Sequence, residues 1–291
     1  MEVIGLPTNP QFQDYLKRAY DLDYVRIGSF PAFKKSDTPL FFGGFKGFYS
    51  VALGASLQEI DSQINDVCAE YPEVVCDISV DDRSAHGALI HYLLDLDSLS
   101  PGSDRLDLYE KKTRNQVRKS HLNELRVTVG PPPRGFYALY TESMRRLKSP
   151  PRNEGHFAAL ERHLGSSIVC FSLYSGDTLI GCNYSIVFSG YQLLCFNVSD
   201  NRYWHLNVND RLYDEMIVWA LKEGVRFIDF GPSVRKDVSH NHFKEGFGAR
   251  ARVIVDRQKM PLWKKIKSFF SQKKRNMRIR LLRLSSYMTK I

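Results

Sequence analysis

Side chains that could do chemistry cluster between residues 212 and 248 of this sequence. Asp229 lies inside the apolar run 225–230, where a carboxylate must be paired or face a cleft, because burying it alone is costly. Ser233 follows in a turn, and its hydroxyl could bind a substrate. His240 and His242 could act as bases, since histidine titrates near neutral pH. The stretch therefore offers groups that can bind a polar molecule and move a proton.

Each of these residues also has a purely structural interpretation. Asp229 could bind backbone N–H groups or an arginine and so fix the end of its strand. Ser233 could serve only the turn, and a solvated loop histidine is commoner than a catalytic one. The residue types alone leave both interpretations open.

A second cluster is basic and reads KKTRNQVRK over residues 111–119, within a helix that we predict over 104–121. Arg114 and Arg118 are four residues apart and share one helix face, with Lys119 next to them. Together they could hold phosphate groups through bidentate contacts, and Asn115 could cap or bridge the same region. The alternative is a solvated helix face, which is the usual role of a run of charges.

A helix, a strand and a loop must position the residues of the first cluster. Apolar residues recur at helical spacing over 212–221, and Gly224 ends this predicted helix. The run 225–230 is typical of a buried strand, and a turn at 231–233 leads into a polar loop. These elements bring their side chains to one end of a sheet, where α/β folds form clefts.

The rest of the chain alternates helices and strands. After residue 122 the predicted order is strand, two helices, three antiparallel strands, helix, strand, loop and strand, with hairpins at Gly176-Asp177 and Ser189-Gly190. Residues 1–100 show a looser version of this order. The predicted fold class is therefore α/β (α+β), with mixed, mostly antiparallel sheets flanked by helices.

Composition excludes several classes of protein. The chain has 291 residues, of which 43% are hydrophobic and 25% charged, as in soluble globular proteins. No apolar run reaches the ~18 residues that suggest a membrane span, and the start MEVIGLPTNP lacks the features of a signal peptide. The five cysteines have no metal-ligand spacing, which favours reduced thiols and no metal site. We therefore expect a cytoplasmic protein.

The net charge of +9 comes from the C-terminus. Residues 260–291 contain ten lysines and arginines and no acids, which leaves 31 of the 41 basic residues against all 32 acidic ones. Apolar and basic residues alternate there at helical spacing, which predicts an amphipathic helix on an anionic membrane surface. The alternatives are a helix docked on its own domain and, less favoured, an RNA-binding arm; DNA binding is not expected.

Three segments resemble the FemAB-like branch of the GNAT acyltransferase superfamily, which includes the BioF2-like domain. The basic helix KKTRNQVRKS is similar to the family pattern K-x-x-R-N-x-I/V-R-K-A. The strand pair SLYSGDTLIGCNYSIVF is similar to its V-x-L-x-x-G-x-x-I/V-A-G segment. The third and most specific piece is LYDEMIVWALKEGVRFIDFGPS followed by FKEGFGA, which resembles the family's D-F-G-R-S and F-K-x-x-F/W-G motifs. The three pieces span about residues 105–255 in the order that the family has them.

The resemblance implies two GNAT-like units in tandem. We place them at 1–103, a divergent unit, and 104–259, the FemAB-like unit, followed by the basic tail at 260–291. It also implies a crevice where two sheet-based halves meet, beside a splayed sheet and walled by the DFG-to-FKEGFG segment.

The same resemblance suggests roles for individual residues. Asp229 and His242 are the predicted catalytic pair. Four basic residues are predicted to bind the phosphates of the donor: Arg114, Arg118, Lys119 and Lys244. Substrate contacts are expected from Ser233, Asn115 and Phe243. Two family features are missing, since Pro232 replaces the arginine after DFG and no R-x-x-G-x-G/A pyrophosphate loop is found.

The function implied by the resemblance is an N-acyltransferase. We expect it to move an acyl group from an activated donor, acyl-CoA, to an amino group of a cell-envelope glycan, amino sugar or lipid-linked precursor. The first alternative is an aminoacyl-tRNA-dependent enzyme acting on a peptidoglycan-type precursor. The second is a non-catalytic GNAT-like binding module. The tail would place the protein on the inner face of the cell membrane.

Overall fold

The structure is a computed structural model that describes residues 1–35, 39–44, 49–71, 73–80, 89–100 and 102–259. Its centre is one mixed sheet, in the order β2-β3-β4-β6-β13-β7-β12-β11-β10-β9-β8, with β5 and β1 branching from β6. The predicted tail, 260–291, lies outside the described residues.

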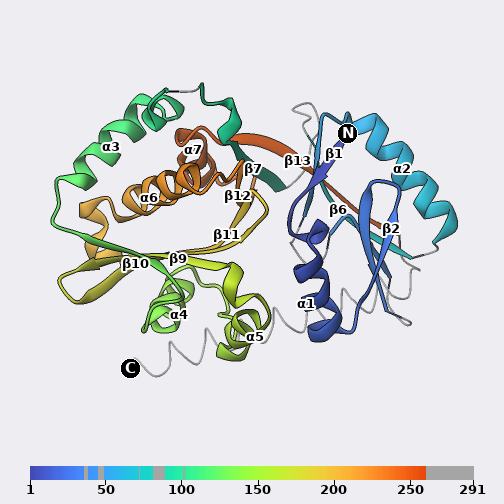
Figure 1. Ribbon diagram of the computed structural model, residues 1–291, viewed down its shortest axis with the longest axis horizontal. Helices are drawn as coiled ribbons and strands as arrows, with labels where there is room; N and C mark the ends of the chain where they lie inside the picture. The colour runs from blue at the N-terminus through green and yellow to red at the C-terminus, as the bar shows by residue number, and fades with distance from the viewer. Residues whose placement is uncertain (36–38, 45–48, 72, 81–88, 101, 260–291) are drawn as a thin grey trace.

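The sheet has two halves that β13 joins (Figure 1). The N-terminal half contains β1 (Glu2–Ile4), β2 (Asp23–Ile27), β3 (Phe30–Lys34), β4 (Leu40–Phe42), β5 (Ser50–Leu53) and β6 (Val74–Val80). The other half contains β7 (Leu89–Asp95), β8 (Arg126–Gly130), β9 (Ile168–Ser175), β10 (Thr178–Phe188), β11 (Tyr191–Ser199) and β12 (Phe227–Val234). The last strand, β13 (Arg250–Lys259), pairs with β7 through its first residues and with β6 through its remaining ones.

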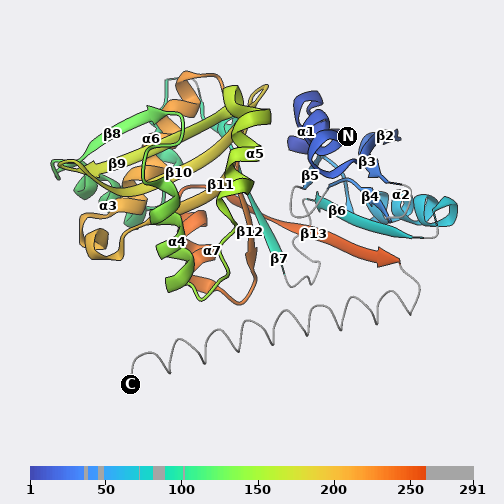
Figure 2. The ribbon, with the colours of Figure 1, turned by 90° about the horizontal axis from the view of Figure 1, so that it is seen from below.

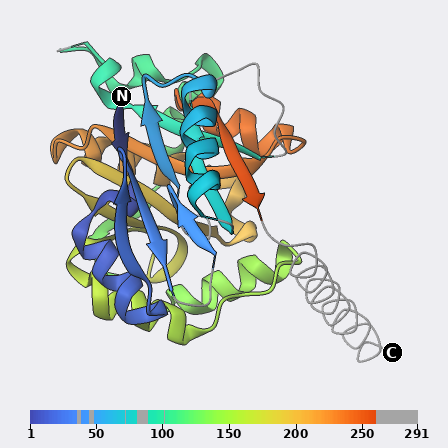
Figure 3. The same cartoon turned by 90° about the vertical axis from the view of Figure 1, so that its right-hand side faces the viewer.

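Helices cover both faces of this sheet. They are α1 (Pro10–Tyr20), α2 (Leu57–Glu70), α3 (Lys111–His121), α4 (Phe136–Arg146), α5 (Glu154–Leu164), α6 (Val208–Lys222) and α7 (Val238–Gly246). In the C-terminal half, α3, α6 and α7 lie on one side of β9–β11 and α4 and α5 on the other (Figures 1 and 2). In the N-terminal half, α2 packs on β6, as Figure 3 shows from the side. The predicted class, a mixed sheet flanked by helices, is confirmed.

Side-chain caps explain where several helices begin. The Asn9 side chain accepts hydrogen bonds from the start of α1, and Ser56 and Glu59 form a capping box at the start of α2. Asn153 accepts from the His156 N–H and so starts α5. Each cap satisfies an N–H group that the helix itself leaves without a partner.

The two halves share part of their hydrophobic core. Phe12 and Tyr15 of α1 are almost fully buried in the same cluster as Tyr140 of α4 and Leu160 of α5. Burying one such side chain contributes roughly 1.5–3 kcal/mol. The packing of α1 against α5 therefore holds the N-terminal half close to the C-terminal one.

Three boundaries differ from the prediction. The single helix expected over 104–121 is two elements, a short 3-10 turn (Arg105–Leu108) and α3. The helix is interrupted at Glu110, whose N–H donates to the Gly246 carbonyl and not to a carbonyl of the preceding turn. The expected loop after the turn at 231–233 contains α7, which Asp237 caps through the His240 N–H. Strand β12 also continues through the predicted turn to Val234, because β7 pairs with it on both sides of a bulge.

Candidate active site in the splayed sheet

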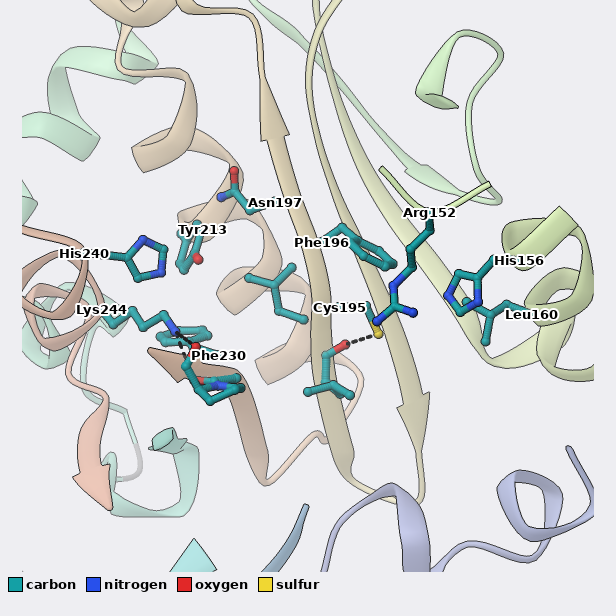
Figure 4. Close-up of a pocket in the computed structure, with 14 residues that line it drawn as sticks. Arg152, His156, Leu160, Cys195, Phe196, Asn197, Tyr213, Phe230, His240 and Lys244 are labelled. Atoms are coloured by element: carbon teal, nitrogen blue, oxygen red, sulfur yellow. Dashed lines mark hydrogen bonds between the residues drawn. The ribbon is translucent and has the colours of Figure 1, made fainter. Parts of the chain in front are cut away.

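Strands β11 and β12 separate along their length and leave a cavity between them. They pair in parallel only from Tyr191↔Phe227 to Leu193↔Asp229, and the later residues diverge. The cavity between the diverging strands has a volume of about 330 Å³. Tyr213, His240 and Lys244 line it from one face of the sheet, and Arg152, His156 and Leu160 from the other (Figure 4). The opening therefore reaches both faces, and the splayed sheet that the resemblance implies is present.

A bulge in β11 lies at the wall of this cavity. Leu194 pairs with Ser185 and Phe196 with Tyr184 of β10, which leaves Cys195 without an opposite residue. A bulge turns peptide groups away from the regular ladder. Within the described part of the chain, β11 pairs with β12 only as far as Leu193. Peptide groups of residues 194–197 that point away from β10 thus face the cavity.

A second bulge shapes the facing wall. The pairing of β12 with β7 shifts between Asp229 and Pro232, so Phe230 and Gly231 together lie opposite the single residue Tyr92. Gly231 has a φ of 69°, a conformation that glycine adopts without strain. Asp229 stabilises this turn, because its Oδ1 accepts the Gly231 N–H at 2.6 Å. The carboxylate therefore fixes the wall of the cavity.

Asp229 also belongs to a buried polar network at the junction of the two halves. Its Oδ1 lies 2.7 Å from Nε2 of His91, whose Nδ1 lies 2.8 Å from Oγ of Ser79. Its Oδ2 accepts a hydrogen bond from the Tyr191 hydroxyl. A serine, a histidine and an aspartate linked in this way also form the catalytic triad of serine hydrolases. Here Ser79, His91 and Asp229 are all buried, so a substrate cannot reach the Ser79 hydroxyl.

The network keeps Asp229 ionised. Burial acts to raise the pKa of this carboxyl group, but His91, the Tyr191 hydroxyl and the Gly231 N–H outweigh it and lower the pKa. Burial, and then the Asp229 carboxylate, raise the pKa of Tyr191. Asp229 thus acts on the cavity through the turn that it holds.

Lys244 fastens the same turn from α7. Its Nζ donates to the Gly231 carbonyl at 2.9 Å, with the Pro232 carbonyl at 3.5 Å (Figure 4). It also donates to Oγ of Ser233 at 2.8 Å. Burial lowers the pKa of this amine to about 8. The three ammonium protons therefore already face protein acceptors, and the Ser233 hydroxyl is engaged with them.

The two histidines of α7 have different positions. His240 lines the cavity, where partial burial and the Lys244 charge lower its pKa. It is therefore mainly neutral at neutral pH and can accept a proton. The side chain of His242 is 57% exposed, with Nε2 3.9 Å from a carboxylate oxygen of Glu110, and it does not line the cavity.

The remaining predicted site residues lie away from the cavity lining. Phe243 packs against Tyr213 and Phe247, with ring centroids 5.0 and 5.3 Å apart. Four predicted residues lie on α3, which packs against α6 and α7: Arg114, half-buried, and Asn115, Arg118 and Lys119, all exposed. Of the predicted site residues, Asp229 and Lys244 thus lie together, at the Gly231 turn that both of them bind. The basic residues of α3 do not line this cavity.

Sequence reasoning missed the face of the cavity formed by Arg152 and His156. The segment 149–153 reads SPPRN, and its prolines indicate only the end of a helix. Tyr213 also lines the cavity, although its helical spacing predicts a core residue and its side chain is buried. Burial raises the pKa of this phenol, so it keeps its proton.

Residues 111–245 match the family model for the acetyltransferase (GNAT) domain. This segment of the chain is therefore similar to a GNAT acetyltransferase domain. The match covers α3 to α7 and thus the whole cavity between β11 and β12. No curated protein matches the chain in sequence.

Three solved structures have a similar fold. FemX is 11% identical, with a TM-score of 0.59 over 92% of this chain and 99% of that chain. The C-terminal domain of a putative lysylphosphatidylglycerol synthetase from Agrobacterium fabrum is 9% identical, with a TM-score of 0.54 over 86% and 87%. The L-PGS structure from Bacillus licheniformis is 12% identical, with a TM-score of 0.52 over 83% and 85%. These likenesses extend the shared fold to the N-terminal half.

No helix in the described part of the chain is long and apolar enough to cross a membrane. Within the same ranges, no group of three or more His, Cys, Asp or Glu side chains could hold a metal ion.

Proposed function

We propose that this GNAT protein transfers an acyl group from acyl-CoA to an amino group of a cell-envelope glycan, amino sugar or lipid-linked precursor. One observation carries the proposal: side chains from both faces of the sheet line the cavity at the β11–β12 splay. An activated acyl group and an amine can therefore enter from opposite faces and meet between the strands.

The residues of the cavity can perform each step of acyl transfer to an amine. The neutral amine attacks the acyl carbonyl carbon, and peptide N–H groups at the Cys195 bulge bind the oxyanion that forms. His240 takes the proton that the amine loses as the C–N bond forms. The C–S bond then breaks, and the departing thiolate takes the proton from His240, which becomes neutral again. Asp229 and Lys244 hold the wall against which these groups are aligned.

The acceptor class is supported by the fold relatives. One of them is named for lysylphosphatidylglycerol, an aminoacylated phospholipid, and has the fold of this chain over most of its length. An acceptor with a large lipid or glycan part would need a cavity that reaches the surface, and exposed residues such as Pro232 and His240 line this one.

Aminoacyl-tRNA as the donor is the second candidate. Asp210 lies in the first turn of α6, where its carboxyl is mostly buried, and burial raises its pKa to about 6. A helix N-terminus ordinarily favours a phosphate, and an acid in that turn opposes one. The acid at Asp210 therefore favours a donor that has no pyrophosphate group at the N-terminus of α6, as aminoacyl-tRNA could be. Arg114, Arg118 and Lys119 would then contact donor phosphates on the exposed face of α3.

The donor is tested by turnover measurements with the purified full chain. Acyl-CoA consumption is measured against a panel of amino sugars and amino-terminated lipid precursors, with charged tRNA as a separate donor. Acyl-CoA turnover that depends on the amine supports the proposal. Activity only with charged tRNA would replace it by the second candidate, and inactivity with every donor would favour a binding module.

A peripheral position on the inner face of the cell membrane completes the proposal. It rests on the amphipathic basic pattern of residues 260–291. The domain division at residues 103 and 259 stays a prediction.

A further inference from the structure

Three large apolar side chains are exposed at one end of the C-terminal half of the sheet. Leu122, which directly follows α3, is 84% exposed, and Leu147, which directly follows α4, is 63% exposed. Trp204 is 49% exposed and lies in the 3-10 segment η5 (Asn201–Leu206), which leads from β11 to α6. A single exposed apolar residue is ordinary, whereas several on one surface mark a contact site.

Side-chain contacts join these three segments into one surface. On one side of η5, the Nδ2 atom of Asn123 donates to the Leu206 carbonyl at 3.2 Å. On the other side, the guanidinium of Arg146 lies over the Trp204 ring, 4.8 Å from its centroid, and donates to the Ser199 carbonyl at 3.0 Å. The segment η5 therefore connects the ends of α3 and α4, which lie on opposite sides of the sheet (Figure 2).

This end surface, which we define as residues 118–124, 142–148 and 200–206, is also basic. It contains six lysines and arginines and three acids. Two of the acids form ion pairs within the surface, Glu142 with Arg145 and Asp200 with Arg202. Because the arginines of both pairs are exposed, water screens these pairs, and the surface keeps a net positive charge.

The combination of side chains fits a lipid surface better than a nucleic acid. Leucine and tryptophan side chains enter the interfacial region of a bilayer, and lysine and arginine bind its anionic headgroups. An RNA strand could stack on Trp204 and bind the arginines, but it would leave Leu122 and Leu147 in water. The exposed leucines therefore favour lipid.

The end surface lies close to the cavity between β11 and β12. Asn197, which lines the cavity, is two residues before Ser199 on β11, and Arg146 of the end surface binds Ser199. A bilayer against the end surface would therefore lie near the end of β11, and a lipid-linked molecule could approach the cavity without leaving the membrane.

We infer that the end surface docks on an anionic phospholipid bilayer. Leu122, Leu147 and Trp204 enter the interfacial region, and the basic side chains bind the headgroup phosphates. This inference goes beyond the proposed function, which assigns membrane contact to residues 260–291 alone, and it holds whatever group is transferred.

Tryptophan fluorescence tests which surface of the bound protein faces the lipid. The full chain has three tryptophans, at positions 204, 219 and 263. The double variant Trp219→Phe, Trp263→Phe keeps only Trp204. The control, Trp204→Phe with Trp263→Phe, keeps only Trp219, which packs against Phe171 in the last turns of α6. Vesicles of phosphatidylglycerol and brominated phosphatidylcholine in equal parts should quench most of the Trp204 emission and leave that of Trp219 unchanged.

A second measurement shows how much affinity the leucines supply. Leu122→Gln combined with Leu147→Gln should weaken co-sedimentation of the full chain with phosphatidylglycerol vesicles roughly ten- to a hundredfold, because two leucines no longer enter the lipid. The control is Val238→Gln, since Val238 is 73% exposed at the start of α7, outside the end surface. All three positions are exposed, so the urea midpoints should stay unchanged.

Three outcomes would overturn the inference: no binding to anionic vesicles, unquenched Trp204 in vesicle-bound protein, or full binding by the leucine variant. Unquenched Trp204 would show that residues 260–291 hold the protein on the membrane with another surface toward the lipid. Loss of tRNA binding in Arg118→Gln together with unquenched Trp204 would identify an RNA partner and also overturn it.

Vesicle binding needs no turnover, so the proposed function is judged separately. Quenching of Trp204 in a protein that transfers no acyl group from any donor would keep this inference and reject that function.

Discussion

His240 is the side chain whose protonation should control the reaction. It must be neutral to accept a proton from the amine, and its pKa lies below the ordinary 6.5. We therefore expect kcat/KM to be maintained at neutral pH and to fall as the pH drops through the lowered pKa. His240→Gln should remove this dependence and reduce kcat by roughly a hundredfold or more. Full pH–rate profiles of both proteins provide the measurement.

His242 is the matched control on the same helix. Its exposed side chain lies outside the cavity lining, so His242→Gln should leave the profile unchanged. The opposite result is that His242→Gln removes the fall of kcat/KM at low pH and His240→Gln keeps it. That result would make His242 the catalytic base, as predicted from the sequence, and would exclude His240.

Asp229 should matter for folding as well as for the reaction. Asp229→Asn leaves buried partners without their charge, and we expect it to cost roughly 3–5 kcal/mol of unfolding free energy at pH 7. Because the folded-state pKa is lowered, this contribution is present above the unfolded value of about 3.9 and is lost as the pH falls through the folded pKa. Urea unfolding at pH 7 and pH 3.5 tests both statements, and equal midpoints at pH 7 would refute them.

Lys244 gives the opposite dependence on pH. Its folded-state pKa of about 8 is below the ordinary 10.5, so the native state binds fewer protons than the unfolded chain between these values. Stability should therefore rise with pH in this window, by about 3 kcal/mol at most. Lys244→Met should show a smaller rise in urea midpoints between pH 7.5 and 10, and an identical rise would show that another group is responsible.

Among the elements, α7 is the one whose position depends most on a close contact. A Cβ added at Gly246 would lie 2.3 Å from Oγ1 of Thr113 on α3. Gly246→Ala should therefore separate α7 from α3, cost roughly 1–3 kcal/mol of stability and weaken the cavity wall. Gly155→Ala in α5 is the control, because its nearest atom would be Asn153 Oδ1 at 3.7 Å. Thermal unfolding of both variants tests this difference.

The elements also show how far the sequence can predict the site. Hydrophobic periodicity and turn residues predicted α4, α5, α6 and the three strands β9–β11 with small boundary errors. Helix α7 was missed, because 238–246 carries two histidines, an asparagine and a glycine in place of a clear apolar stripe. The bulge at Gly231 was taken for a turn, since only the pairing of β12 with β7 shows that the strand continues.

The features of the site that the sequence did not predict depend on contacts between residues far apart in the chain. Asp229 was known from its place in an apolar strand, but its partner His91 is 138 residues away. Arg152 was overlooked, because nothing in SPPRN indicates that two tyrosines of α4 fix its backbone. The sequence thus identified the segment that walls the cavity, whereas the opposite face required the structure.

At the scale of the whole molecule, the basic C-terminus should determine where the protein works. Residues 260–291 lie outside the described part of the structure, and membrane binding through them stays a prediction. Replacing Lys264, Lys265 and Lys267 by Gln should weaken co-sedimentation of the full chain with anionic phospholipid vesicles. At ~1 kcal/mol for each basic residue, the loss is about a hundredfold in affinity. Neutral vesicles are the control, and unchanged binding to anionic ones would exclude the membrane role of these lysines.

Strand β13 has a consequence for biosynthesis. It is the last described strand, yet it lies between β6 and β7 and pairs with residues 74–80 over a separation of more than 170 positions. Earlier segments can form their helices and hairpins while the ribosome is still translating, but β6 and β7 wait for residues 250–259 to emerge. A nascent chain that lacks β13 therefore exposes unpaired edges of β6 and β7 at the centre of the sheet, and chaperones would bind this incomplete form.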